Sequence, residues 1–325
     1  MFIEQKRLPS ASDILNKCPI DENLGKVKQQ FDKIIKDNFV NRKKLTVVCG
    51  PCSADNLDSM DEYLRKLKQI QTIHPNLLIV ARIYTTKPHS NGQGYKGTCF
   101  QQSISDDVDI EEGIIRSRQM MINCLKLGLP VADELLYPEL YRYFEDLVSY
   151  WFVGARSSED AIHRGFASGL DICCGVKNGT DGDLQKVVDS VYAISNPCVI
   201  PYNGAQIATK GCKYAHVVLR GGKTENGFVS NLSYKHTNIV KEYLRNLGLN
   251  DFIMVDLSHA NSGKVAKNQI ENAKLVANNP DVHGVMGERY LFEGASDNSY
   301  GVSKTDPCLN FDDTVKVVEI LDTPR

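Results

Sequence analysis

The stretch LTVVCGPC (45–52) sets the pattern of the chain: an apolar run of strand length ends in a reactive side chain, Cys52. Seven further stretches follow the same pattern. They are LLIVARIYTTKP (77–88), PVADE (130–134), WFVGAR (151–156), DICCGVK (171–177), HVVLR (216–220), FIMVDLSH (252–259) and HGVMGE (283–288). Segments with apolar residues at helical spacing lie between several of them. Eight buried strands with reactive groups at their carboxyl ends predict a (β/α)₈ TIM barrel, which carries its site at that end.

Two segments fall outside this pattern. Residues 1–44 are polar and partly helical, with Leu24, Val27, Phe31 and Ile34 spaced to share one helical face. They predict an N-terminal extension before a catalytic barrel at 45–325. PCVIPY (197–202) is typical of a strand but ends in no reactive group, so we expect an inserted β-hairpin outside the barrel near 197–213.

Composition excludes several classes of function. The 325 residues carry a formal net charge of −2 with no basic block, which argues against a nucleic-acid partner. No apolar run reaches membrane-spanning length, and the first residues lack the apolar core of a secretory signal. Ten cysteines without such a signal indicate reduced thiols. We therefore expect a cytoplasmic protein with no membrane partner.

Four potential metal ligands lie far apart in the chain: Cys52, His259, Glu288 and Asp306. A mixed sulfur, nitrogen and oxygen set suits a divalent transition metal such as Mn, Fe, Co or Zn. Taken singly, each has an ordinary alternative, because a buried Cys behaves as an apolar residue and a lone His often only satisfies a hydrogen bond. Three of the four end predicted strands on one face, and this favours the metal interpretation.

Five cations are expected on the same face of the barrel. Without an anion between them they would repel one another, so a substrate with phosphate and carboxylate groups would explain them. The alternative is that some are solvated or paired with Glu134. The five are Arg82, Lys87, Arg156, Lys177 and Arg220.

At these positions the chain resembles a known family, the 3-deoxy-D-arabino-heptulosonate 7-phosphate (DAHP) synthases, in their microbial class I type with an N-terminal extension. The resemblance runs from about residue 8 to the C-terminus, with the motifs in the family order. The motifs are GPCS (50–53), KP (87–88), GAR (154–156), HR with ASGL (163–170), KNGTDG (177–182), LRGG (219–222), DLSHANS (256–262) and GVM-x-E (284–288).

The resemblance implies a metal-dependent, aldol-like condensation of phosphoenolpyruvate with erythrose 4-phosphate, the first step of the shikimate pathway. It implies a homodimer or homotetramer, with Cys52, His259, Glu288 and Asp306 as metal ligands. Lys87 is then the expected proton donor to the aldehyde, since a Lys among other cations has a lowered pKa; with Cys52 and His259 it makes up the expected catalytic group. The implied phosphoenolpyruvate contacts are Arg82, Lys87, Glu134, Arg156, Lys177 and Arg220.

One departure concerns the acceptor. The family usually has KPRT where this chain has Lys87-Pro88-His89-Ser90, and these residues belong to the aldose-phosphate site. His89 and Ser90 either still hold erythrose 4-phosphate or accept a different aldehyde in a specialised pathway. Two other interpretations stay open: a non-catalytic regulatory paralogue, and a metal-independent Schiff-base aldolase that uses Lys177.

His89→Arg distinguishes the two acceptor hypotheses. An uncharged imidazole gives one hydrogen bond where Arg gives a fork, and a charge-assisted bond is roughly twice as strong as a neutral one. We expect the variant to bind erythrose 4-phosphate more tightly, and the parent to lose affinity for it as the pH rises through the His pKa. The test is kcat/KM for several aldehydes; equal and pH-independent handling by both proteins would exclude His89 from the acceptor site.

Overall fold

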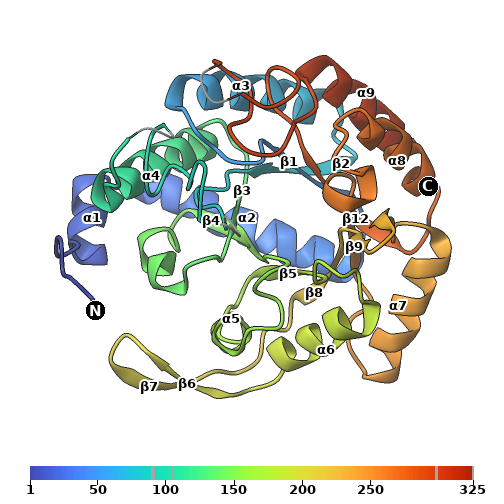
Figure 1. Ribbon diagram of the computed structural model, residues 1–325, viewed down its shortest axis with the longest axis horizontal. Coiled ribbons are helices and arrows are strands. Elements are labelled where there is room, and N and C mark those ends of the chain that lie inside the picture. The colour runs from blue at the N-terminus through green and yellow to red at the C-terminus, as the bar shows by residue number, and fades with distance from the viewer. Residues whose placement is uncertain (89–91, 104–105, 297–298, 324–325) are drawn as a thin grey trace.

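The computed structural model describes residues 1–88, 92–103, 106–296 and 299–323. Within them, eight parallel strands close into a barrel in the order β1-β12-β11-β8-β5-β4-β3-β2 (Figure 1). These are the eight strands predicted from the sequence, so the predicted fold class is confirmed. They are β1 (Leu45–Gly50), β2 (Leu77–Arg82), β3 (Val131–Glu134), β4 (Val148–Val153), β5 (Cys173–Lys177), β8 (Ala215–Leu219), β11 (Ile253–Asp256) and β12 (Val282–Glu288).

Helices surround the barrel and bury one apolar side against it, as Figure 1 shows. In α3, for example, Met60, Tyr63 and Leu67 are buried at helical spacing. The connection after β3 is a 3₁₀ helix, η1 (Pro138–Tyr143), in place of an α-helix. The surrounding helices are α3 (Leu57–Ile73), α4 (Ile110–Lys126), α5 (Ala161–Ala167), α6 (Leu184–Ser195), α7 (Tyr234–Asn246), α8 (Asn268–Ala277) and α9 (Phe311–Leu321).

The N-terminal segment forms α1 (Ala11–Lys17) and α2 (Glu22–Asn41), and α2 runs across the barrel (Figure 1). Ile35 and Phe39 of α2 join the apolar side chains inside the barrel. Phe39 stacks on Phe252, which precedes β11, at 4.9 Å between ring centres. The helix therefore closes the amino-terminal end of the barrel. The proposed boundary between extension and barrel at residue 44 stays a prediction.

The expected hairpin is present as β6 (Val199–Tyr202) and β7 (Ala205–Ala208), an antiparallel pair outside the barrel. A second hairpin, β9 (Gly222–Thr224) with β10 (Gly227–Val229), follows β8 and was not predicted, because its strands are too short for a clear alternation. Among the described residues, no helix combines the length and apolar character needed to cross a membrane.

Phe39→Ala tests whether α2 is part of the barrel core. Removing a buried aromatic ring leaves a cavity, and we expect a loss of about 3–5 kcal/mol in the free energy of unfolding. Val40→Ala is the matched control, because Val40 is 62% exposed and its truncation should change stability by less than about 0.5 kcal/mol. Urea unfolding measures both. Equal values for the two variants would contradict the packing of α2 against the barrel.

Candidate active site

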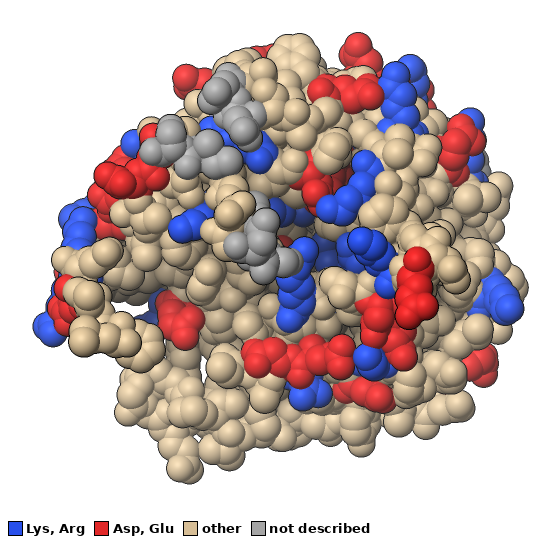
Figure 2. All heavy atoms as spheres, in the orientation of Figure 1, with Lys and Arg blue, Asp and Glu red and all other residues tan. Residues whose placement is uncertain are grey.

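The carboxyl ends of the strands surround one cavity of about 470 Å³. Figure 2 shows Lys and Arg side chains gathered around a hollow on this face of the molecule. The structure thus brings together all five predicted cations, with Cys52, Glu134, His259 and Asp306 from the predicted set. The lining residues are Cys52, Arg82, Lys87, Pro88, Glu134, Gly154, Ala155, Arg156, Lys177, Arg220, His259, Lys264, Thr305 and Asp306. His89 and Ser90 lie outside the described residues.

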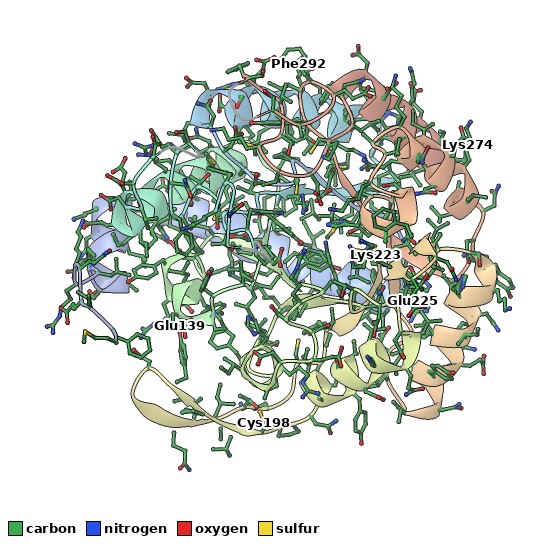
Figure 3. The ribbon with its side chains drawn as sticks, viewed as in Figure 1. Glu139, Cys198, Lys223, Glu225, Lys274 and Phe292 are labelled. Carbon is green, nitrogen blue, oxygen red and sulfur yellow. The ribbon has the colours of Figure 1, made fainter. Side chains whose placement is uncertain are left out.

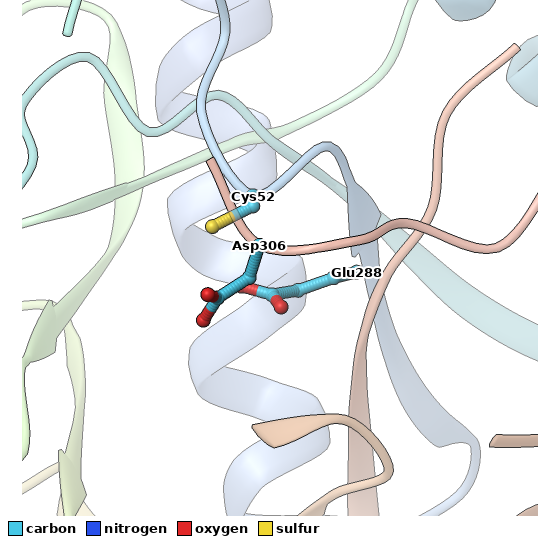
Figure 4. A group of neighbouring side chains, drawn as sticks. All are labelled: Cys52, Glu288 and Asp306. Carbon is cyan, nitrogen blue, oxygen red and sulfur yellow. The ribbon is translucent and has the colours of Figure 1, made fainter. Parts of the chain in front are cut away.

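Cys52, Glu288 and Asp306 converge at one side of this cavity (Figure 4). One ligand atom from each lies within 4.8 Å of the others. His259 adjoins the cluster, with Nε2 3.4 Å from Glu288 Oε1. A thiolate and two carboxylates this close repel one another, and a divalent cation between them would offset that repulsion. The mixed donor set therefore fits a divalent transition metal.

The pKa of Cys52 reflects this crowding. Burial, and after it the neighbouring Glu288 carboxylate, raise the pKa of the thiol above its ordinary value. Metal binding at a thiol requires the thiolate, so a bound cation has to displace this proton. The loop after β1 places Cys52 here: its backbone N–H donates to Cys308 Sγ at 3.2 Å, from the loop that also carries Asp306.

A buried chain of two cations and two carboxylates, joined by His259, runs along the wall of the cavity. Lys177 Nζ lies 3.2 Å from Asp256, Asp256 2.9 Å from His259 Nδ1, and Arg82 3.1 Å from Glu288. His259, at the start of the 3₁₀ helix η2 (His259–Ser262), joins the two halves by its contact with Glu288. Burial acts to raise the pKa of Glu288, but His259 and Arg82 outweigh it and the pKa is lower than usual. Burial acts in the same way on Asp256, where His259 and Lys177 outweigh it and the pKa is also lowered, so both carboxylates are held in the charged form.

Lys87 lies against the metal-type ligands. Its Nζ donates to Cys52 O at 2.9 Å and to Cys52 Sγ at 3.1 Å. Burial by itself lowers the pKa of Lys87, but the neighbouring Cys52, Glu288 and Glu134 outweigh it, and the pKa is above the ordinary value of Lys. The expected lowering was therefore wrong in direction: counting nearby cations overlooked the buried anions that face the same ammonium group.

Buried asparagines hold the loop that carries Arg220. Asn178 Oδ1 accepts from Arg220 N at 2.8 Å, and Asn178 Nδ2 donates to Gly221 O at 3.0 Å. Asn261 Nδ2 donates to Leu219 O at 3.1 Å. Two of the sequence motifs, KNGTDG and DLSHANS, thus serve to orient a cation that comes from a third.

Glu134 reaches the cavity because Gly154 gives it room. A Cβ at position 154 would lie 2.0 Å from Glu134 Oε1, so no larger residue fits without displacing the carboxylate. This close approach accounts for the glycine of the GAR motif, which also carries Arg156. The roles predicted for Glu134 and Arg156 in binding substrate stay predictions.

Three residues at the site were not singled out by their pattern in the sequence. Lys264 lines the cavity and its Nζ lies 3.0 Å from Asp306. Thr305 lines it beside Asp306, and Asp256 forms the centre of the charge chain. Asp256 is the first residue of DLSHANS and Lys264 lies two residues after this motif, so their closeness to the motif could have marked them as site residues. The partner of Asp256 is 79 positions away and that of Lys264 is 42 positions away, so neither contact could be predicted from the sequence.

Asp133 is a further buried carboxylate that was not predicted. It is 2% exposed; Oδ1 accepts from Thr85 N at 3.1 Å, and Oδ2 from Thr85 Oγ1 at 2.8 Å. Thr85 lies two residues before Lys87, so this pair ties the end of β3 to the loop that carries Lys87. Burial raises the pKa of Asp133 to about 7, against the effect of the hydrogen bonds from Thr85.

Comparisons of the sequence and of the structure with known proteins lead to the same family of enzymes. Residues 30–319 match the family model described as the DAHP synthetase I family. Phospho-2-dehydro-3-deoxyheptonate aldolase of Corynebacterium glutamicum is 32% identical over 96% of this chain and 90% of its own length. The Phe-sensitive enzyme of that name from Escherichia coli is 33% identical, over 96% and 92%. The solved structure of the Francisella tularensis aldolase superposes with a TM-score of 0.92 at 32% identity, over 99% of this chain and 98% of that one.

Asp133→Asn tests the buried carboxylate through pH. Because the pKa of Asp133 is raised from an ordinary 3.8 to about 7, the folded state holds the proton over that range and the unfolded state does not. The contribution of Asp133 to stability is therefore present at low pH and is lost as pH rises toward 7. Asn keeps the shape without this loss, so the variant should gain stability relative to the parent as pH rises.

Urea unfolding of parent and variant at several pH values measures this trend, with Asp37→Asn on the exposed side of α2 as the control. A difference between Asp133→Asn and the parent that does not change with pH would contradict the assignment.

Proposed function

The chain belongs to the DAHP synthetase I family and is an enzyme of the phospho-2-dehydro-3-deoxyheptonate aldolase type, and we propose that it condenses phosphoenolpyruvate with erythrose 4-phosphate to give DAHP and phosphate, the first step of the shikimate pathway. One observation carries the proposal: five cations line a single cavity beside a cluster of a thiol and two carboxylates. The first set suits an anionic substrate and the second a metal ion.

Phosphoenolpyruvate matches the cations in charge and shape. It carries a carboxylate and a phosphate, and a guanidinium binds either group with two parallel hydrogen bonds. Arg82 and Lys177 are each paired with a buried carboxylate, which holds them in position at strand ends. Arg156 and Arg220 lie just beyond strands β4 and β8. In the proposal these four cations and Lys87 bind the two anionic groups, and Glu134 completes the substrate contacts.

A divalent metal held by Cys52, His259, Glu288 and Asp306 would polarise the carbonyl of the acceptor aldehyde. Lys87 donates the proton that the aldehyde oxygen gains when C3 of phosphoenolpyruvate bonds to the carbonyl carbon. Water adds at C2, and phosphate leaves with its bridging oxygen, so one water molecule is consumed for each phosphate released. The cations neutralise the phosphate throughout, which favours its departure.

A second candidate keeps phosphoenolpyruvate and changes the acceptor. It is favoured by His89-Ser90, which replace the residues usual at the aldose-phosphate site. The presence of the cations and metal-type ligands in one cavity argues against a non-catalytic paralogue. Burial lowers the pKa of Lys177 and the contact with Asp256 only partly opposes this, so the loss of turnover after chelation, and not the charge of Lys177, separates the metal-dependent reaction from a Schiff base. A homodimer or homotetramer and a cytoplasmic location are part of the proposal.

Cys52→Ala and metal removal test the proposed chemistry. Loss of an outer partner of a metal ligand costs roughly 10–100-fold in affinity or activity, and a direct ligand should cost at least as much. We expect the variant, and the parent after exhaustive chelation, to lose phosphate release from phosphoenolpyruvate and erythrose 4-phosphate while staying folded. Added Mn²⁺ or Co²⁺ should restore the parent alone.

Cys18→Ala, a half-buried thiol of the N-terminal segment, is the matched control and should behave as the parent. Mass analysis of the product with a panel of aldose phosphates separates the two acceptors. Full turnover after chelation, with borohydride trapping of substrate on Lys177, would contradict the metal-dependent reaction and support the Schiff base.

A further inference from the structure

Three residues of the site come from three separate loops. Cys52 lies between β1 and α3, Lys87 between β2 and α4, and Asp306 between β12 and α9. Loops are less constrained than strands, and a metal site tolerates only small errors in the position of its ligands. Some contact has to fix these loops relative to one another.

Lys304 links the three loops through one ammonium group. It belongs to the third loop, two residues before Asp306. Its Nζ lies 3.6 Å from Asp55 Oδ2 in the first loop. The same Nζ donates to Gln102 O at 2.7 Å and lies 5.0 Å from the centre of the Tyr95 ring, both in the second loop. A cation at this distance over an aromatic ring is attracted to it.

The partners of Lys304 are themselves buried and anchored. Asp55 is 5% exposed, and its Oδ1 accepts from Tyr290 OH at 2.8 Å. Tyr95 is fully buried, and its hydroxyl lies 3.1 Å from Thr98 Oγ1. Thr98 in turn donates to Ala54 O, so the first and second loops are also bonded directly. Movement of Lys304 would therefore disturb a connected network.

This contact differs from the surface ion pairs of the protein. The side chain of Lys304 is 13% exposed and that of Asp55 3%, whereas in the pair of Lys274 and Glu271 they are 56% and 68% exposed. Burial raises the pKa of Asp55, and Tyr290 and Lys304 act against it by stabilising the charged form. Removing one member of a buried pair leaves the other uncompensated, which costs far more than the loss of a surface pair.

We infer that Lys304 is a positioning residue: its ammonium group holds the three loops together so that Cys52, Lys87 and Asp306 meet at one place. The inference rests on the proposed function for the roles of those three residues. Lys304 itself does not line the cavity, so it acts through the loops and not on the substrate. If Lys304 only stabilised the fold, its removal would lower the free energy of unfolding without a selective effect on metal affinity or on KM for the acceptor.

The test compares Lys304→Met, Lys304→Arg and the control Lys274→Met. Met keeps the length of Lys without its charge, and Arg restores the charge. Lys274 lies on α8 at the outer edge of the molecule (Figure 3). Cobalt binding is followed without substrate by the sulfur-to-cobalt charge-transfer absorption, which reports a thiolate ligand and is assigned to Cys52 by its loss in Cys52→Ala. Steady-state assays then give KM for each substrate and kcat.

We expect Lys304→Met to weaken cobalt binding by roughly 10–100-fold, as for other residues that support metal ligands. KM for the aldose phosphate should rise and kcat fall, whereas KM for phosphoenolpyruvate, held mainly from strand ends, should change least. Lys304→Arg should recover most of both effects, and Lys274→Met should match the parent. Cobalt affinity and KM values of Lys304→Met equal to those of the parent would overturn the inference.

Hydrogen exchange gives a readout that does not depend on the metal. Amides in residues 51–56, 92–103 and 299–310 should exchange faster in Lys304→Met and not in Lys274→Met. Faster exchange confined to 299–310 would overturn the inference. If the parent binds no cobalt but exchange rises in all three segments, the proposed metal site fails while the role of Lys304 in holding the loops stands.

Discussion

The buried chain in which His259 joins two ion pairs, Lys177–Asp256–His259–Glu288–Arg82, is the constraint on which the site depends. Charges removed from water are costly unless they are paired and hydrogen-bonded, and replacing such pairs by apolar residues is often neutral or stabilising. A barrel interior that retains four of them together with a histidine therefore gains little stability from them. What it gains is a fixed set of cations and carboxylates at the ends of β2, β5, β11 and β12, ready for an anion and a metal.

The cations at the strand ends and the site residues on loops are held in position in different ways. Most of the cations proposed to bind phosphoenolpyruvate stand at strand ends or within three residues of them, where the hydrogen-bonded barrel fixes their position. Cys52, Lys87 and Asp306 stand on loops, and these loops are tied by contacts such as those of Lys304 with Asp55 and of Asp133, on β3, with Thr85.

Much of the fold could be predicted because strands of a parallel barrel are buried on both faces and appear as continuous apolar runs. The reactive residues at the carboxyl ends of these strands indicated the site, because a barrel enzyme carries its site at that end. The exact face that a helix turns toward the barrel was harder to predict, and α2 is an example. Ile35 is buried and Ile34 is 46% exposed, because at about 100° per residue Ile35 returns to within about 20° of Leu24 and Ile34 does not.

Interactions between distant residues could not be predicted. Asp55 and Lys304 are 249 positions apart and Lys177 and Asp256 79, and no local pattern links either pair. The error in the pKa of Lys87 has the same origin, since the cations were visible as strand ends while the anions facing them were not recognised as neighbours. Residues in family motifs were easier to find than those, such as Asp133 and Lys304, that act on the site through its loops.

The central claim is that one cavity joins a metal centre and an anion site. Anomalous diffraction from crystals of the protein with Mn²⁺ and phosphoenolpyruvate tests it most directly. We expect a single metal peak among Cys52, His259, Glu288 and Asp306, with the phosphate and carboxylate of the substrate among the five cations. A metal bound elsewhere, or phosphoenolpyruvate bound outside this cavity, would contradict it.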